Sequence, residues 1–233
     1  MKYMGSKRRI AKDILPIILK DRQPNQWVVD PFCGGCNLID KVEGKRLAAD
    51  INPYLISMWK ALQNGWLPPD QVSEEDYIDI KNNKDAYPSY LVGFVGIACS
   101  FGSKWFGGYA RGYNGSRNRN YCLESKNNVL KQIKNLQDVK FYAYDYTALM
   151  IPDKSVIYCD PPYKNTTGYK SCFNSAEFWE WAINQSYFGH KVYVSEFSAP
   201  DGWECIWSKN ITTTVAKDTG YKQATEKLFT KSL

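Results

Sequence analysis

The residues of this 233-residue chain best suited to chemistry are four consecutive ones, Asp160, Pro161, Pro162 and Tyr163. The apolar run before them, residues 156–158, predicts a short buried strand, which the prolines must end because proline has no N–H to donate to a sheet. The carboxylate of Asp160 and the carbonyl of Pro161 then lie at a strand's carboxyl end, where open α/β sheets bind ligands. Tyr163 adds an aromatic face. A planar group with an amino donor fits such a site, because it can stack on the ring and donate to both acceptors.

A second pattern lies near the N-terminus. Residues 27–29 form a short apolar run that ends at Asp30, and a glycine turn, Pro31-Phe32-Cys33-Gly34-Gly35-Cys36-Asn37, follows. We expect a helix after this turn, which gives the pattern of a nucleotide-binding first βα unit, where glycines let the backbone approach a ligand closely. Residues 47–49 are another apolar run ending in an acid, Asp50. An acid at that distance from the glycine turn is typical of the residue that holds a ribose.

Acids end four of the expected strands: Asp30, Asp50, Asp145 and Asp160. One such acid is usually a turn or cap residue. Because parallel strands share one carboxyl edge, four of them predict a polar ligand that lies along this edge.

The elements that position these acids alternate between helix and strand. Hydrophobic spacing predicts helices over residues 6–20, 53–62, 74–81, 89–100, 124–136 and 175–188. Strands are expected at residues 27–30, 47–49, 139–144, 156–159 and 192–195, with late antiparallel edge strands at 205–207 and 227–230. The sequence therefore predicts an α/β sheet covered by helices.

The α/β rhythm breaks between about residues 74 and 120. Residues 101–121 contain several glycines and no acid. The cations of this segment are Lys104, Arg111, Arg117 and Arg119, and its aromatic residues are Trp105, Phe106, Tyr109, Tyr113 and Tyr121. Flexible backbone, cations and stacking rings together indicate a nucleic-acid surface. The alternative is a solvated loop whose aromatic side chains pack into the core.

Composition limits the possible classes. The chain is long enough for one core with an inserted lobe, and its formal charge of +6 favours an anionic partner. The apolar run at residues 91–99 is too short to span a bilayer, and Lys12 and Asp13 interrupt the run that a secretory signal needs. Seven scattered cysteines suit a reducing compartment. We therefore expect a soluble, unexported protein with no membrane partner.

Other cysteine chemistry is disfavoured by the sequence. Cys33 and Cys36 have the spacing of half a zinc site or a redox pair, but the chain has no second CxxC, and His190 is its only histidine. Cys159 has no basic partner in the sequence, so a buried strand cysteine is the simpler interpretation. We expect no metal.

Several motifs in a fixed order resemble the Dam-like, or D12, class of adenine-specific DNA methyltransferases. These motifs are Tyr3-Met4-Gly5-Ser6-Lys7, Asp30-Pro31-Phe32-Cys33-Gly34-Gly35-Cys36, Ala49-Asp50-Ile51-Asn52-Pro53, Lys104-Trp105-Phe106-Gly107-Gly108-Tyr109, Asp160-Pro161-Pro162-Tyr163, Val194-Ser195-Glu196-Phe197 and Glu226-Lys227-Leu228-Phe229. The resemblance runs nearly end to end. It implies a Rossmann-like methyltransferase sheet with helices on both faces, with residues 1–63 and 122–233 as the catalytic domain and 64–121 as an inserted target-recognition region.

The resemblance also implies roles for individual residues. It assigns the binding of S-adenosylmethionine to Tyr3, Lys7, Asp30, Phe32, Gly34, Asp50, Asp145, Tyr146 and Asp160. It assigns catalysis to Asp160, Pro161, Pro162 and Tyr163. From the composition of residues 101–121, we expect Lys104, Arg111, Arg117 and Arg119 to contact DNA. The chain departs from the family at one position: Cys36 stands where a second glycine is usual, and Gly35 lies one position earlier.

The implied reaction is methylation of the N6 amino group of adenine in double-stranded DNA, with base flipping. Methylation of RNA adenine or of cytosine N4 is an alternative, as is a catalytically silent DNA-binding protein of the same fold. We expect a monomer or weak dimer in the cytoplasm of a prokaryotic or phage-infected cell, acting alone or in restriction-modification.

Overall fold

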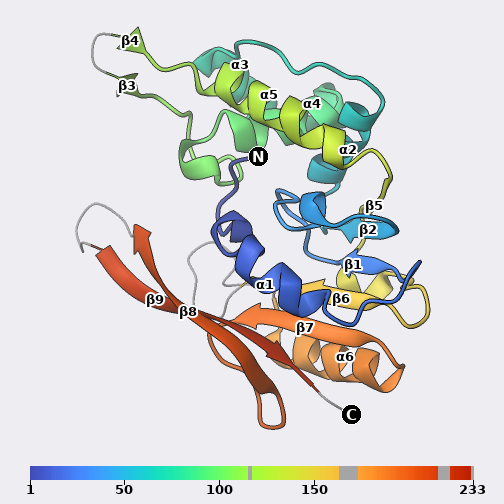
Figure 1. The fold of residues 1–233 in the computed structure, drawn as a ribbon. Helices are drawn as coiled ribbons and strands as arrows, with labels where there is room; N and C mark the ends of the chain where they lie inside the picture. The colour runs from blue at the N-terminus through green and yellow to red at the C-terminus, as the bar shows by residue number, and fades with distance from the viewer. Residues whose placement is uncertain (115–116, 163–172, 215–220, 232–233) are drawn as a thin grey trace. The chain divides into compact units, whose positions relative to one another are not determined.

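The computed structural model describes residues 1–114, 117–162, 173–214 and 221–231 (Figure 1). The helices are α1 (Ala11–Ile18), α2 (Pro53–Gln63), α3 (Glu74–Asn82), α4 (Ser89–Ala98), α5 (Tyr121–Gln132) and α6 (Ser175–Tyr187). The strands are β1 (Val28–Asp30), β2 (Arg46–Ala49), β3 (Tyr113–Asn114), β4 (Arg117–Asn118), β5 (Val139–Tyr142), β6 (Val156–Cys159), β7 (Lys191–Glu196), β8 (Glu204–Thr214) and β9 (Tyr221–Thr230). Short 3-10 helices are η1 (Lys7–Arg9), η2 (Ile39–Lys41), η3 (Lys84–Ala86), η4 (Phe101–Ser103), η5 (Ile133–Asn135) and η6 (Tyr146–Ala148).

Seven strands form one mixed sheet in the order β5-β2-β1-β6-β7-β9-β8. The chain divides into two compact units, which are described separately below. The first unit comprises Met1–Ala11 and Cys33–Leu149, and the second comprises Lys12–Phe32 and Met150–Leu233. The α/β architecture predicted from the sequence is confirmed; the predicted domain boundaries at residues 64 and 121 stay a prediction.

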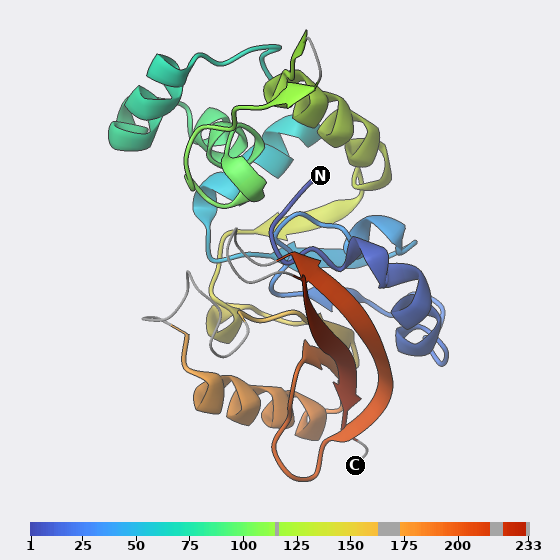
Figure 2. The same cartoon turned by 90° about the vertical axis from the view of Figure 1, so that its left-hand side faces the viewer.

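The second unit is built on parallel strands that end in a hairpin. Strand β6 runs parallel to both β1 and β7, and its four residues are buried, as expected of a strand covered on both faces. Helices α1 and α6 lie on opposite sides of these strands (Figure 2). Strand β9 runs antiparallel to both β7 and β8. The two late antiparallel strands are thus confirmed, but the prediction that residues 227–230 lie at an edge is wrong, because β9 lies between β7 and β8.

The first unit packs its helices beside the parallel pair β2 and β5. Helix α4 carries two glycines at close contacts: Gly93 lies against α2, and Gly96 lies against the Trp105 and Phe106 rings. A Cβ on Gly93 would lie 2.1 Å from the Tyr54 carbonyl oxygen, and one on Gly96 would lie 2.5 Å from the Trp105 ring. Helix α2 begins where the sequence demands: Asn52 accepts hydrogen bonds from the N–H groups of Tyr54 and Leu55, and proline occupies the first turn.

Two predicted elements are shorter than expected. The helix expected after the glycine turn is only the 3-10 turn η2, because fewer than ten residues separate the turn from β2 and they include Gly44 at φ +75°. Strand β5 ends at Tyr142, so Asp145 lies three residues beyond it.

In the described part of the chain, no helix has the length and apolar character to cross a membrane.

Candidate active site

The glycine turn and the acid after β2 are joined directly in the first unit. The N–H of Gly34 donates to Asp50 Oδ2 at 3.0 Å, and the N–H of Asn52 donates to Asp50 Oδ1 at 2.9 Å. Burial raises the pKa of Asp50, and the two backbone donors oppose this effect. Each oxygen accepts one of these bonds and keeps a lone pair for a further donor.

The backbone of the glycine turn adopts conformations that explain its composition. Gly34 has φ +44°, and the N–H of Cys36 closes the turn on the Cys33 carbonyl at 2.6 Å. Cβ atoms at Gly34 and Gly35 would both lie 2.6 Å from Tyr3, whose side chain packs against the turn. Cys36 itself has φ +55°, a left-handed conformation that favours glycine. This chain therefore keeps the backbone shape that a glycine would give at this position while carrying a buried thiol.

The N-terminal segment supplies the two other residues predicted near this turn. Tyr3 lies against Gly34 and Gly35, as described, and Lys7 begins η1 with only 8% of its surface exposed. The Lys7 ammonium lies 3.5 Å from the Gly5 carbonyl oxygen. A buried cation is costly unless polar groups surround it, so Lys7 is not the solvated helix residue that is usual at such a position.

Asp145 has a local structural role. Its Oδ1 accepts hydrogen bonds from the Thr147 N–H at 2.9 Å and from the Thr147 hydroxyl at 2.6 Å, which caps η6. Tyr146 is buried in the same turn. The simpler interpretation of a strand-end acid, a cap, therefore describes the contacts of Asp145 in this structure.

The second unit holds the acid-proline-proline motif. β6 ends at Cys159, and Asp160 follows it half-buried, with Pro161 buried and Pro162 partly exposed. Tyr163 lies outside the described residues. Asp30, at the end of the neighbouring strand β1, is buried and accepts a hydrogen bond from the Phe32 N–H at 3.2 Å. Two strand-end carboxylates thus lie on adjacent parallel strands, as the sequence predicts.

The negative charges of Asp30 and Asp160 change the pKa values of residues in strand β6. Burial, and then the carboxylates of Asp30 and Asp160, raise the pKa of the Cys159 thiol well above its usual value. The thiol is therefore protonated and unsuited to act as a nucleophile. Burial and Asp160 likewise raise the pKa of Tyr158, whose hydroxyl lies 2.8 Å from Ser195 Oγ.

Aromatic rings surround Phe32. Phe178 of α6 contacts it edge-on at 5.6 Å between centroids, and Phe173 does so at 6.1 Å. Phe32 is only partly buried, so its ring combines packing within the second unit with some exposure beside the strand ends.

Two buried side chains that hold the glycine turn were missed from the sequence. Trp59 Nε1 donates to the Gly34 carbonyl at 3.1 Å, and Gln132 Nε2 donates to the carbonyls of Gly35 and Cys36. Both lie on helices far along the chain from the turn, so no local motif could have identified them.

Two of the four predicted DNA-binding cations, Arg111 and Arg119, form ion pairs with glutamates. Arg111 forms a bidentate pair with Glu74, with Nε 3.0 Å from Oε2. Arg119 pairs with Glu124 at 2.8 Å and lies 4.7 Å above the Tyr121 ring. Lys104 is exposed, and Arg117 is described only by its backbone in β4.

The aromatic residues of this region differ from the prediction. Trp105 stacks on Tyr54 at 5.9 Å, Phe106 is buried, and the Tyr109 hydroxyl donates to the Val72 carbonyl at 2.8 Å. Phe106 is therefore not available as a nucleic-acid stacking ring. Trp105 and Tyr109 are half-buried and make these contacts within the first unit, and their stacking on nucleic acid stays a prediction. Phe101 is exposed, at 67%.

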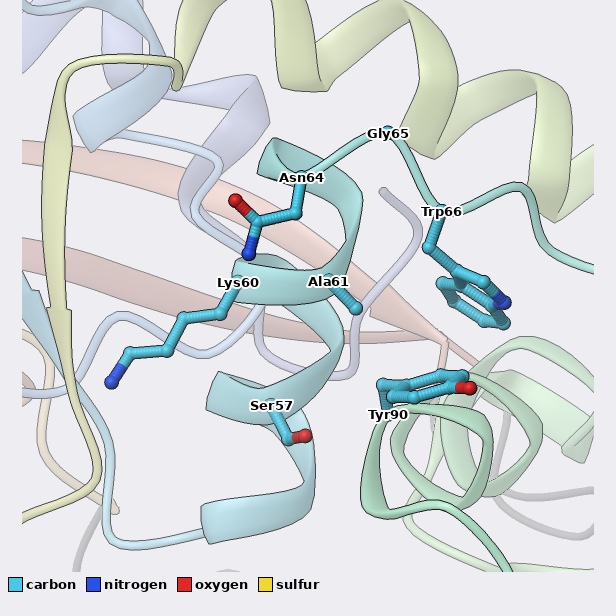
Figure 3. Close-up of a pocket in the computed structure, with 7 residues that line it drawn as sticks. All are labelled: Ser57, Lys60, Ala61, Asn64, Gly65, Trp66 and Tyr90. Carbon is cyan, nitrogen blue, oxygen red and sulfur yellow. The ribbon is translucent and has the colours of Figure 1, made fainter.

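A surface pocket of about 520 Å³ lies along α2 and the start of α4 (Figure 3). It is lined by Ser57, Lys60, Ala61, Asn64, Gly65, Trp66 and Tyr90. Helix α2 begins just after Asp50 and runs away from it, so a pocket beside its second half lies away from Asp50. None of the predicted site residues lines it.

Parallel strands with acids at their carboxyl ends, a glycine turn after β1 and an antiparallel pair at the end define an α/β fold of the Rossmann-like type. The model of the family described as D12 class N6 adenine-specific DNA methyltransferase matches residues 3–95 and 102–200, and the chain belongs to this family. The resemblance inferred from the sequence is confirmed.

Named relatives agree with this assignment. The chain is 29% identical over 195 residues to the modification methylase StsI of Streptococcus sanguinis, covering 72% of this chain and 29% of that protein. It is 28% identical over 185 residues to a DNA adenine methylase of Vibrio cholerae, covering 70% of this chain and 64% of that one. The chain thus spans less than two thirds of either relative.

Solved structures with similar chain traces include TrmN from Thermus thermophilus, with 10% identity and a TM-score of 0.42 over 97% of this chain and 49% of that one. A tRNA (m1A58) methyltransferase from Aquifex aeolicus matches with 11% identity and a TM-score of 0.39 over 95% of this chain and 68% of that one.

Proposed function

We propose that this protein transfers a methyl group from S-adenosylmethionine to the N6 amino group of adenine in double-stranded DNA. The observation that carries the proposal is the position of Asp160-Pro161-Pro162 at the carboxyl end of β6, between β1 and β7, in a chain of the D12 family. The two prolines restrict the backbone, so the carboxylate of Asp160 and the carbonyl of Pro161 are acceptors with little freedom to move.

Residues of the first unit suit S-adenosylmethionine by their chemistry. The carboxylate of Asp50 is an acceptor for ribose hydroxyls, and its bond to Gly34 fixes it beside the glycine turn. Tyr3, Lys7 and Gly34 hold the methionine end, and Asp145 and Tyr146 flank the adenine ring. The sequence resemblance also assigns cofactor contact to three residues of the second unit, Asp30, Phe32 and Asp160. When bound, S-adenosylmethionine supplies an electrophilic methyl group on a sulfonium.

The chain's own task is to make a poor nucleophile react. The amino nitrogen of adenine delocalises its lone pair into the ring, and the base must first leave the duplex stack, at a cost of a few kcal/mol. Asp160 and the Pro161 carbonyl accept the two amino hydrogens, which favours a localised lone pair on nitrogen. Tyr163 stacks on the flipped base. Alignment of the nitrogen with the methyl donor contributes up to roughly 7–11 kcal/mol.

DNA contact is assigned to the cations of the 101–121 segment. Lys104, Arg111, Arg117 and Arg119 contact phosphates, and at least one of the arginines contacts a base edge in the major groove. Arg111 and Arg119 hold their guanidinium planes against carboxylates in this structure, which keeps the planes ordered before DNA arrives.

The test is transfer of labelled methyl from S-adenosylmethionine to unmethylated genomic DNA, followed by nucleoside analysis and mapping of modified sites. We expect N6-methyladenine in a defined sequence. Asp160→Ala should lower turnover about 100-fold or more even at saturating cofactor, because it removes a preorganised group that acts at the reacting nitrogen.

The matched control is Asp153→Ala, which removes an exposed acid from the turn before β6. It should leave turnover unchanged. Methyl transfer to RNA alone, or to cytosine, would replace the proposed substrate. DNA binding without cofactor binding would indicate a silent DNA-binding protein, and full turnover in Asp160→Ala would refute the mechanism.

A further inference from the structure

Three consecutive carbonyl groups of the glycine turn are held by side chains. Trp59 Nε1 lies 3.1 Å from the Gly34 oxygen, and Gln132 Nε2 lies 2.9 Å from the Gly35 oxygen and 3.1 Å from the Cys36 oxygen. The donors come from α2 and α5, 25 and about 96 residues along the chain from the turn. Turns with paired glycines are normally variable in conformation, so these three bonds remove much of that freedom.

Both donors are buried and oriented. Trp59 is fully buried and stacks on Phe141 at an interplanar angle of 9°. Gln132 is 7% exposed, and its amide oxygen accepts a hydrogen bond from the amino group of Met1. The Gln132 amide therefore directs its NH2 group toward the turn. A buried amide is costly unless it is bonded, and here each end has a partner.

The bonds determine which side of the turn its carbonyls face. In a trans peptide the N–H points opposite to the carbonyl, so the Gly35 N–H is directed away from Trp59. Carbonyl oxygens that faced a bound methionine carboxylate would repel it, whereas N–H groups attract it. On the same turn, the Gly34 N–H holds Asp50. Trp59 and Gln132 thus fix the carbonyl orientation of the same turn whose Gly34 N–H holds Asp50.

We propose that Gln132, with Trp59, is a positioning residue that sets the glycine turn and Asp50 for S-adenosylmethionine without touching the cofactor. The assignment rests on the proposed function. It predicts that loss of the Gln132 donor changes cofactor affinity and leaves the methyl-transfer step and DNA affinity nearly unchanged once cofactor is saturating.

The experiment compares Gln132→Leu with Gln63→Leu by calorimetric titration with S-adenosylhomocysteine and by thermal unfolding. Gln63 is a close match, because its amide also donates to backbone carbonyls, those of Leu136, Gln137 and Val139, but away from the glycine turn. We expect Gln132→Leu to raise Kd about 10- to 100-fold, the effect of two lost hydrogen bonds, and Gln63→Leu to leave Kd within about twofold of the parent chain.

A second variant, Trp59→Phe, removes only the indole donor and keeps a ring against Phe141. It should raise Kd for S-adenosylhomocysteine several-fold, while Trp66→Phe, in the same unit, should not. In turnover assays, Gln132→Leu should raise KM for S-adenosylmethionine, with kcat and KM for DNA little changed.

Each outcome decides a separate question. No binding of S-adenosylhomocysteine by the parent chain would overturn the proposed function, and this assignment with it. Tight binding by the parent chain and by both Gln132→Leu and Trp59→Phe would overturn the assignment alone. Equal loss of affinity in Gln132→Leu and Gln63→Leu would reduce Gln132 to a stabilising residue, which also overturns it.

Discussion

The N–H of Gly34 donates to Oδ2 of Asp50 at 3.0 Å, which joins the glycine turn after β1 to the acid after β2. One oxygen of Asp50 therefore accepts a backbone hydrogen bond from the glycine turn, and the other accepts one from the N–H of Asn52, the N-cap residue of α2. A ligand that uses Asp50 must bind through the lone pairs that these two bonds leave. The orientation of Asp50 is therefore set before any ligand arrives.

Asp50→Asn should weaken binding of S-adenosylhomocysteine about 10- to 100-fold, because it removes the charge from a hydrogen-bonded acceptor and places an NH2 group against a backbone donor. Isothermal titration measures the effect. Asp138→Asn changes the same charge at an exposed site in the first unit and should leave affinity unaltered. Equal affinities of Asp50→Asn and the parent chain would remove Asp50 from the cofactor site.

The pH dependence of binding follows from the same carboxylate. Burial raises the pKa of Asp50 above its usual value of 3.8, so protonation begins at a higher pH than for an exposed aspartate. The protonated acid loses acceptor capacity, and affinity for S-adenosylhomocysteine should fall as the pH falls through the raised pKa. The Met1 amino group, whose pKa burial lowers to about 6, titrates in the same unit. Any loss of affinity at low pH that the parent chain shows and Asp50→Asn does not is due to protonation of Asp50. Identical pH profiles of the parent chain and Asp50→Asn would contradict the prediction.

At Cys36, glycine should give a more stable protein than alanine, whereas the reverse is expected at an ordinary buried cysteine. At φ +55° a side chain costs about 1 kcal/mol or more, so Cys36→Gly should be more stable than Cys36→Ala, with a Tm about 2–4 °C higher. Cys159 lies in the buried strand β6, where glycine is disfavoured, so Cys159→Gly should be less stable than Cys159→Ala. Thermal unfolding of the four variants tests both orders. The same order at both positions would show that the conformation of Cys36 carries no strain.

Local chemistry explains which features the sequence predicts. The prolines after Cys159 end β6 where expected, and the paired glycines of the turn are required by contact with Tyr3. Contacts between distant segments are different. The hydrogen bonds of Gln132 to the glycine turn depend on where α5 packs, and the local sequence around Gln132 does not predict that packing.

The aromatic residues of the 101–121 segment illustrate the same limit. Their composition favours a stacking surface as much as a core, and only packing decides. Gly96 on α4 leaves space that Trp105 and Phe106 fill, so these rings pack inward. Lys104, Arg111 and Arg119 remain at the surface, because a buried charge is costly.

The pairing of Arg111 with Glu74 makes a prediction for DNA binding. A phosphate or base edge must compete with the Glu74 carboxylate for Arg111, so Glu74→Gln should strengthen binding to duplex DNA by up to about fivefold, the range of an exposed ion pair. Glu75→Gln is the matched control, since it removes the same charge from the next, exposed position of α3. Fluorescence anisotropy across a salt series measures both.

The variant Arg111→Ala distinguishes the two kinds of DNA contact. If Arg111 contacts a phosphate, Arg111→Ala should weaken binding to all DNA sequences alike and reduce the salt slope by about 0.9. If Arg111 contacts a base, the loss of affinity should be confined to the recognised sequence. Equal gains in Glu74→Gln and Glu75→Gln would show that only net charge matters, and Arg111→Ala with unchanged affinity would remove Arg111 from the DNA surface.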